Sequence, residues 1–232
     1  MPTPSNPAQS HTPNLAREFT QAEKQALYDV ILHRRDVRNE FLPNPIDEHV
    51  LRRILMAAHK APSVGLSQPW RFILVRDPKT RGRVKQAFQR ANEEAVKMFP
   101  EAQQSAYAAL KLEGIEKAPL NICVVCDRSD LSEPILGNTH NPDMDLYSTV
   151  CAVQNLWLAA RAEGVGVGWV SIYHDADLRE ILNLPDNVVI VAYLCVGYVE
   201  KLFDGPELAA RGWASPVELD SVIMEETWSD FS

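Results

Sequence analysis

Three arginines stand within five residues of one another, Arg34, Arg35 and Arg38, and Asp36 lies among them. Guanidinium groups match phosphate oxygens through paired N–H donors, so the three side chains can converge on one anion. A solvated helix end, whose basic residues the helix dipole favours, would have the same composition. In that case Asp36 simply pairs with Arg34 or Arg38. The residues leave two interpretations open, a phosphate clamp and a charged helix end.

A second segment that could contact a ligand is the loop at residues 61–70, APSVGLSQPW. It carries small hydroxyl residues and exposed backbone between two prolines, and it comes directly before a strand expected over residues 71–75. Loops at strand edges often contact ligands, although a tight connection between two elements would look similar.

Glycines alternate at Gly164, Gly166 and Gly168, after a helix and before a strand expected over residues 167–172. This order is the reverse of the strand-to-helix turn that binds dinucleotide phosphates, so the glycines do not indicate a Rossmann site. They can end the helix and allow close packing. Alternatively, they can leave bare backbone so that a flat ligand lies against residues 168–171.

The sequence does not favour metal or redox chemistry. Cys123 and Cys126 have C-x-x-C spacing, but they lie in a strand-like run, where positions three apart face opposite sides of the sheet. His140, Asp143 and Asp145 carry metal-binding groups, yet an Asn-Pro turn and a helix cap account for the same residues. We therefore expect four reduced cysteines and no metal site.

The pattern of apolar residues predicts the elements that position these groups. A capping box at residues 20–23 begins the first helix, and further helices are expected over residues 47–59, 78–90, 146–160 and 175–182. Strands are expected over residues 71–75, 120–126, 167–172 and 188–198, the last of them central in the sheet. Helices and strands alternate without a βαβ repeat, which predicts a layered α+β fold.

The helix expected over residues 146–160 is apolar on nearly every face. A helix with this pattern is normally buried all round. In a chain of 232 residues, a copy of the helix from a second subunit is one way to cover every face. This feature predicts a homodimer.

Composition predicts one domain at residues 19–232, after a disordered, proline-rich N-terminal extension at residues 1–18. The formal net charge of -8 argues against a general affinity for nucleic acid or anionic lipid. No apolar run reaches the roughly 18 residues that a membrane span needs, and the N-terminus is unlike a signal peptide. These features predict a cytoplasmic protein that does not bind nucleic acid or membranes.

Two segments of the domain have a weak pattern. Residues 91–117 are helical in propensity but irregular, and they could form a movable lid or a fixed surface hairpin. Residues 208–232 carry little periodicity, so they are either a disordered tail or an arm over the partner subunit.

Four segments together resemble the flavin-dependent nitroreductase superfamily: residues 34–38 (RRDVR), 61–72, 137–172 and 210–213 (ARGW). The arginine cluster and the P-S-x-x-x-x-Q-P-W loop are typical of the superfamily at large. Asp36 in the middle of RRDVR and Ser171 in GWVSI resemble one branch of it, the 5,6-dimethylbenzimidazole synthases. The resemblance covers approximately residues 19–228.

The resemblance implies a nitroreductase-like sheet flanked by helices, in an intertwined homodimer with two FMN pockets at the interface. It implies that Arg34, Arg35, Arg38 and Arg211 hold the FMN phosphate and ribityl chain, with Pro62, Ser63 and Ser67 nearby. The backbone of Gly168, Trp169 and Val170, continuing to Ser171, would lie along the isoalloxazine ring. A lid at residues 91–117 would suit a branch whose members cover the flavin closely.

The branch implies an unusual reaction, in which reduced FMN is the substrate. With O2 it is broken to 5,6-dimethylbenzimidazole, the lower ligand of cobalamin, and erythrose 4-phosphate, while a separate flavin reductase supplies reduced FMN. Such a site needs a base near the ribityl carbon and a hydrogen-bond partner for the ring, for which Asp36 and Ser171 are the candidates. Two other functions remain open: an NAD(P)H-dependent FMN nitroreductase or ene-reductase, and a non-catalytic flavin-binding protein.

Overall fold

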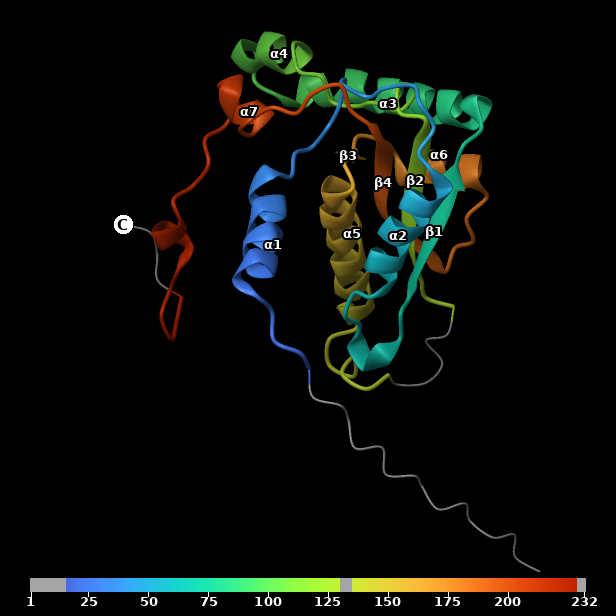
Figure 1. The fold of residues 1–232 in the computed structure, drawn as a ribbon. Coiled ribbons are helices and arrows are strands. Elements are labelled where there is room, and N and C mark those ends of the chain that lie inside the picture. Colours follow the sequence, from blue (N-terminus) through green and yellow to red (C-terminus); the bar gives the residue numbers. More distant parts are fainter. Residues whose placement is uncertain (1–15, 130–134, 229–232) are drawn as a thin grey trace, which may run out of the picture.

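The computed structural model describes residues 16–129 and 135–228, and its centre is a four-stranded antiparallel sheet (Figure 1). The strands are β1 (Trp70–Val75), β2 (Leu120–Asp127), β3 (Val165–Val170) and β4 (Val188–Tyr198), in the order β1-β2-β4-β3. The predicted central position of β4 is confirmed. The bounds expected for β3 are wrong by two residues, because the ladder with β4 already begins at Val165 opposite Tyr198 and ends at Val170 opposite Tyr193.

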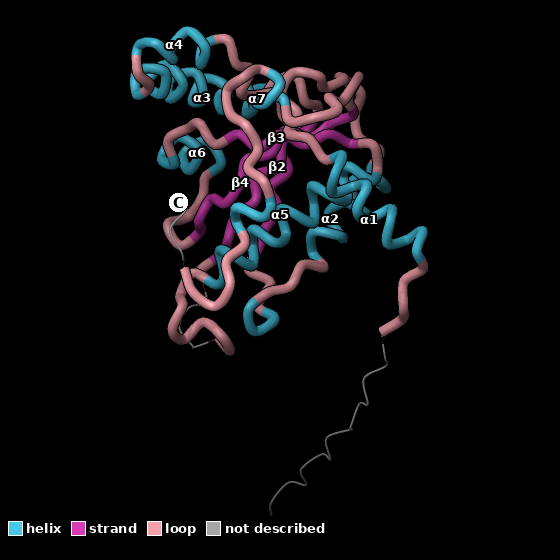
Figure 2. Tube along the Cα trace, turned by 90° about the vertical axis from the view of Figure 1, so that its left-hand side faces the viewer, coloured by secondary structure: helices cyan, strands magenta, loops and turns pink. Residues whose placement is uncertain are grey.

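Helices cover both faces of the sheet, so the layered α+β prediction is confirmed (Figure 2). α2 (Glu48–His59) and α5 (Met144–Ala162) pack on one face, and α3 (Pro78–Met98) and α6 (Asp175–Leu182) pack on the other. Strand positions alternate between these two cores, as β-sheet geometry requires. Cys123 accordingly lies under α3 and α6, and the four cysteines are free thiols.

α5 is the central helix of the first layer, and it ends where the sequence predicts, at Gly164 with φ of 74°. Leu156 and its buried neighbours pack against the sheet and α2. The sheet and α2 cover one side of the helix, so a single chain does not bury all its faces. Tyr147 and Val150 are 54% and 44% exposed, and the neighbouring Cys151 is also exposed. An apolar stripe of α5 therefore remains uncovered in the single chain.

α1 (Gln21–His33) begins at the predicted capping box, in which Thr20 and Glu23 bond each other's backbone amides. None of its residues is buried, although it carries several large apolar side chains. Leu27, Tyr28 and Leu32 are 54%, 64% and 65% exposed. The helix lies at the side of the fold, beside α5 (Figure 1).

The segment predicted as a lid or hairpin begins inside a helix. α3 continues to Met98 instead of ending near residue 90, because Ala91 still packs into the core on the same helix face as Phe88. After Pro100 a short helix follows, α4 (Glu101–Ala108). Phe99, between the two helices, stacks on Tyr107 at 4.8 Å and meets Trp213 edge-on at 5.4 Å.

The C-terminal segment follows α7 (Glu207–Ala210) and extends away from the sheet on the side of α1 (Figure 1). Its described part, residues 208–228, carries exposed apolar side chains, including Val217 and Leu219 at 74% and 70% exposure. The rest of the predicted arm, residues 229–232, and most of the predicted N-terminal extension, residues 1–15, lie outside the described residues. In the described ranges no helix has the length and apolar character to cross a membrane.

Candidate functional site

The arginine cluster follows α1 and runs beside the outer edge of β3. Val37 donates its backbone amide to the carbonyl of Val167 at 3.0 Å, and Asp36 forms a parallel bridge with the same residue. A Cβ atom added to Gly168 would stand 1.8 Å from the carbonyl oxygen of Val37. Glycine at this position is therefore required by close packing of the chain itself, which is one of the two interpretations open from the sequence.

Asp36 is fixed between this edge and the arginines. Its Oδ1 accepts a hydrogen bond of 2.9 Å from the Trp169 amide, and its Oδ2 accepts two from Arg38, at 2.9 and 3.1 Å. Burial raises the pKa of Asp36 and outweighs the lowering effects of Arg38 and the Trp169 amide. A carboxylate whose pKa is raised is better suited to accept a proton than an exposed one.

The three arginines and Asp36 line one cavity of about 250 Å³, closed on its other side by residues 203 and 205–208. Arg34 lies over the indole ring of Trp157, with its guanidinium carbon 4.9 Å from the ring centre. Arg35 donates to backbone carbonyls, among them Phe203 at 3.0 Å and also Asp204, so it ties the loop after β4 to the cluster. A shared anion site was one of the two interpretations that the sequence left open, and in the structure each guanidinium also has a contact within the chain.

Arg211 does not line this cavity. Its Nε donates to Oε1 of Glu207 at 2.6 Å, and Glu207 is one of two α7 residues that line the cavity. Sequence reasoning missed Glu207, and it missed Trp157 as the platform under Arg34. The four-residue spacing of Glu207 and Arg211 was the one available signal for the first of these contacts.

The loop at residues 61–70 has a strained backbone. A short 3-10 helix (Val64–Leu66) gives Gly65 a φ of 52°, and Leu66 and Gln68 have positive φ values of 56° and 46°. Ser63 Oγ accepts from the Gln68 amide at 3.1 Å, and Pro62 before it is exposed. Non-glycine residues with positive φ cost free energy and gather at ligand-binding segments.

The side chain of Ser67 has no hydrogen-bond partner among the described residues. Its Oγ is buried and neither donates nor accepts a hydrogen bond there. Buried polar atoms are almost always satisfied, so an unsatisfied hydroxyl at a predicted ligand contact fits a ligand or a partner group.

The structure does not bring the loop and the arginine cluster together within one chain. The loop is held at the start of α5, where Val64 donates its amide to Ser148 Oγ at 3.0 Å. Arg34 lies on Trp157 of the same helix. Nine residues of helix separate Ser148 from Trp157, which corresponds to about 14 Å along the axis.

The remaining predicted site residues follow one another at the end of β3. Trp169 is half-buried, with its ring 6.2 Å from that of Trp157, and Val170 is buried. Ser171 is exposed directly after the strand, two residues beyond the amide that binds Asp36. The predicted pair of catalytic residues therefore shares one edge of the sheet with the arginine cavity.

The acidic residues considered as metal ligands have another role. Arg128 binds both Asp143 and Asp145, at 2.9 and 2.6 Å. Across residues 16–129 and 135–228, no three His, Cys, Asp or Glu side chains are grouped so that they could hold a metal ion.

Comparisons with known proteins agree with this architecture. The nitroreductase family model matches residues 31–198. The 5,6-dimethylbenzimidazole synthase of Rhodospirillum rubrum is 46% identical over 197 residues, which cover 85% of this chain and 93% of that protein. The 5,6-dimethylbenzimidazole synthase of Rhodobacter capsulatus is 41% identical over 195 residues, covering 84% and 94%.

A solved structure supports the same fold. Iodotyrosine deiodinase bound to FMN and 3-iodo-L-tyrosine superposes with a TM-score of 0.69 at 21% identity, over 87% of this chain and 100% of that one. With an antiparallel sheet between two helical layers and curated relatives matched over nearly their full length, this chain belongs to the nitroreductase family, within its group of 5,6-dimethylbenzimidazole synthases.

Proposed function

We propose that the protein is a 5,6-dimethylbenzimidazole synthase that uses O2 to fragment reduced FMN into the lower ligand of cobalamin and erythrose 4-phosphate. The observation that carries the proposal is the position of Asp36. Its carboxylate is held at 2.9 Å by the Trp169 amide and opens onto a cavity lined by arginines. A carboxylate beside a phosphate site opposes anion binding, so a buried one at this position favours a role in the reaction.

The arginine cavity fits the phosphate end of FMN. A guanidinium stacked on an indole ring, as Arg34 is on Trp157, keeps its N–H donors at its rim, where phosphate oxygens can accept them. Arg38 offers further N–H donors. Its positive charge is paired with the negative charge of Asp36. Arg35 shapes the cavity through the loop after β4, and Arg211 acts from its edge through Glu207.

We infer that two copies of the chain complete each site. The loop with Pro62, Ser63 and Ser67 stands about 14 Å along α5 from the arginine cluster of its own chain. If two α5 helices pack side by side in opposite directions, the loop of one subunit comes next to the arginines of the other. The uncovered stripes of α5 and α1 supply an apolar surface for that contact, and the unsatisfied Ser67 hydroxyl fits a site completed by a partner.

Reduced FMN supplies the electrons that O2 accepts, and its own carbon atoms become the benzimidazole. In this proposal the carboxylate of Asp36 accepts the proton that the ribityl chain must lose. Ser171 donates its hydroxyl to the ring, and the backbone of Gly168, Trp169 and Val170 lies beside it. Within the segment predicted as a lid, residues 91–117, the part that follows α3 serves as the cover that excludes water, anchored by the contacts of Phe99 with Tyr107 and Trp213.

The test is aerobic incubation with FMN kept reduced by a separate flavin reductase, followed by chromatography for 5,6-dimethylbenzimidazole. Formation of the benzimidazole supports the proposal. Oxidation of NAD(P)H by the protein itself, with transfer to a nitro compound or alkene and no benzimidazole, would identify a reductase. Bound FMN that survives every reductant unchanged would identify a flavin-binding protein without catalytic activity.

A further inference from the structure

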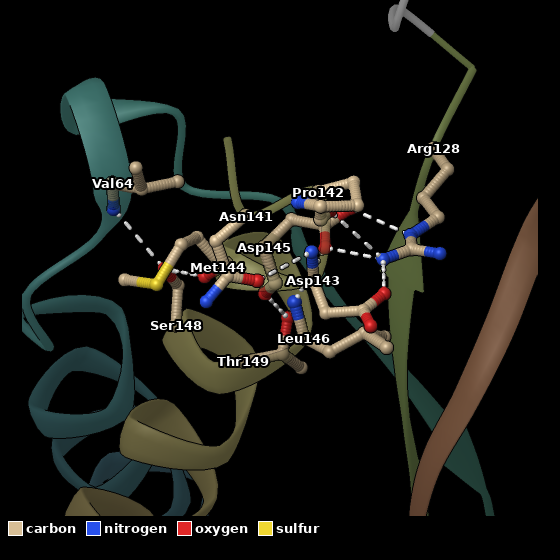
Figure 3. A network of polar contacts seen from close by, with 10 residues as sticks. All are labelled: Val64, Arg128, Asn141, Pro142, Asp143, Met144, Asp145, Leu146, Ser148 and Thr149. Carbon is tan, nitrogen blue, oxygen red and sulfur yellow. Dashed lines mark hydrogen bonds and ion pairs between the residues drawn. The ribbon is translucent and has the colours of Figure 1, made fainter. Parts of the chain in front are cut away.

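A polar network fixes the first turn of α5 to the sheet (Figure 3). Arg128, which directly follows β2, binds Asp145 through two hydrogen bonds of 2.6 Å, one to each carboxylate oxygen. The side chain of Asp145 is 3% exposed. A buried ion pair with paired geometry holds its two elements in one orientation, because leaving either charge without the other is costly.

The same arginine holds the chain ahead of the helix. Arg128 donates to the carbonyl of Pro142 at 3.2 Å and to Asp143 at 2.9 Å. Its own backbone amide donates to Asn187 ahead of β4 at 3.0 Å. The helix start is therefore fixed to the loop before it and to the end of the sheet where β2 stops and β4 begins.

Ser148, one turn into the helix, connects this fixed start to the strained loop. Its Oγ donates to the carbonyl of Met144 at 2.6 Å and accepts from the amide of Val64 at 3.0 Å. The carbonyl of Val64 in turn accepts from the amide of Ser67 at 2.9 Å. A continuous series of hydrogen bonds thus runs from the helix start to Ser67, whose buried hydroxyl has no partner among residues 16–129 and 135–228.

We propose that Ser148 is a positioning residue, which aims the Ser67 hydroxyl and the adjoining backbone at the flavin from a helix start locked by Arg128 and Asp145. The identity of the ligand rests on the proposed function, whereas the coupling between Ser148 and the loop does not. Positive φ angles at Leu66 and Gln68 must be held by surrounding contacts. Removing the Ser148 hydroxyl leaves the Val64 amide unpaired and lets the loop relax.

A matched control lies next in the chain. Thr149 is buried, and its Oγ1 donates to the carbonyl of Asp145 at 2.9 Å, which is the same kind of contact that Ser148 makes with Met144. Thr149 makes no hydrogen bond to the loop among those that the structure shows for it. Thr149→Val therefore removes a helix hydroxyl without disturbing Val64, and Ser148→Thr keeps the hydroxyl that Val64 needs.

The experiment measures two quantities for Ser148→Ala, Ser148→Thr and Thr149→Val: the dissociation constant of oxidised FMN, by flavin fluorescence, and the benzimidazole formed per reduced FMN consumed. The second quantity is measured with folded enzyme in excess and at a concentration well above the dissociation constant of each variant, because free reduced FMN reacts with O2 without the enzyme and would lower the ratio. We expect Ser148→Ala to weaken FMN binding at least tenfold and to lower the ratio at least fivefold, with peroxide formed instead. Ser148→Thr and Thr149→Val should stay within about threefold of wild type.

Equal effects of Ser148→Ala and Thr149→Val on both quantities would overturn the positioning role. If wild type binds FMN but forms no benzimidazole, the proposed function is wrong, and the binding comparison alone then decides the role of Ser148. Weaker FMN binding in Ser148→Ala, restored in Ser148→Thr, supports the role; unchanged binding in Ser148→Ala contradicts it.

Discussion

Oδ1 of Asp36 accepts a hydrogen bond of 2.9 Å from the backbone amide of Trp169. This contact joins the arginine cluster to the strand end that carries Ser171, so the two candidate catalytic residues have a fixed spacing. Oδ2 of the same carboxylate binds Arg38. Because burial raises the pKa of Asp36 despite these partners, the folded protein holds the charged carboxylate at a cost in free energy.

Asp36→Asn should abolish benzimidazole formation without lowering the thermal stability at pH 7. The folded-state pKa of Asp36 is raised, so its contribution to stability is most favourable below the unfolded value of 3.8 and declines as pH rises through the folded pKa. The asparagine variant has no ionisable group at this position, so its stability does not decline as the pH rises through the folded pKa of Asp36. A melting temperature more than about 4 °C below wild type, roughly 1 kcal/mol or more for a chain of this size, would show instead that Asp36 is chiefly an ion-pair partner for Arg38.

Ser171→Gly removes a hydroxyl that is exposed at the end of β3, so it should leave the fold intact. If Ser171 positions the ring, the variant should bind reduced FMN within about tenfold of wild type and still react with O2. The products should be oxidised FMN and hydrogen peroxide in place of benzimidazole. Product chromatography with peroxide detection checks this, and a wild-type yield of benzimidazole would remove the assigned role.

Arg34→Ala should weaken FMN binding by roughly ten- to a hundredfold, as expected for loss of about 1.5–3 kcal/mol from a charge-assisted phosphate contact. The melting temperature should change little, because the guanidinium lies on Trp157 at the cavity rim. Arg35→Ala should also lower stability, since Arg35 ties the carbonyls of residues 203 and 204 to the cluster. Arg83→Ala removes an exposed, paired arginine and serves as the charge control.

Unchanged FMN affinity in Arg34→Ala and in the equivalent alanine variants of Arg38 and Arg211 would place the phosphate elsewhere. An equal loss in Arg83→Ala would mean that the effect reflects net charge alone. Fluorescence titration at two salt concentrations separates these outcomes, because a direct phosphate contact is screened less than a distant charge.

Sequence patterns predicted the local features well because those features depend on neighbouring residues. The capping box at Thr20, the C-terminal glycine of α5 at Gly164 and the full extent of β4 all match. The length of α3 did not, because its last turns are held by packing of Ala91 and not by a regular apolar stripe.

Contacts in the candidate site between residues far apart in the chain could not be predicted from the sequence. The reason for glycine at position 168 is the carbonyl of Val37, which stands 131 positions earlier in the chain, on the segment beside β3. The resemblance implied that Ser67 and Arg34 share one pocket. In the structure, the loop that carries Ser67 contacts α5 at Ser148, whereas Arg34 contacts α5 at Trp157, so the two lie at separate positions along the helix. Periodicity reports which face of a helix is apolar, and it does not report which other element meets that face.

Val150→Asp should convert the protein to a monomer. Val150 lies 44% exposed in the apolar stripe of α5, and a charge at the centre of a subunit interface would be desolvated without a partner. Light scattering should then give a mass near 26.0 kDa for the variant and about twice that for wild type. FMN binding should fall with the dimer, because each site would lose the loop of the other subunit.

Asn187→Asp adds the same charge to an exposed loop and should stay dimeric with normal FMN affinity. A wild-type mass of a single chain at micromolar concentration would contradict the dimer. Full FMN affinity in a monomeric Val150→Asp would contradict the shared site even if the wild type is a dimer.

The most direct test of the central claim is the mass balance of a single aerobic turnover, with enzyme in excess over reduced FMN. The account predicts about one 5,6-dimethylbenzimidazole for each FMN lost, formation of erythrose 4-phosphate, and no product when O2 is excluded. Recovery of all the flavin as oxidised FMN, with an equivalent amount of hydrogen peroxide, would contradict it.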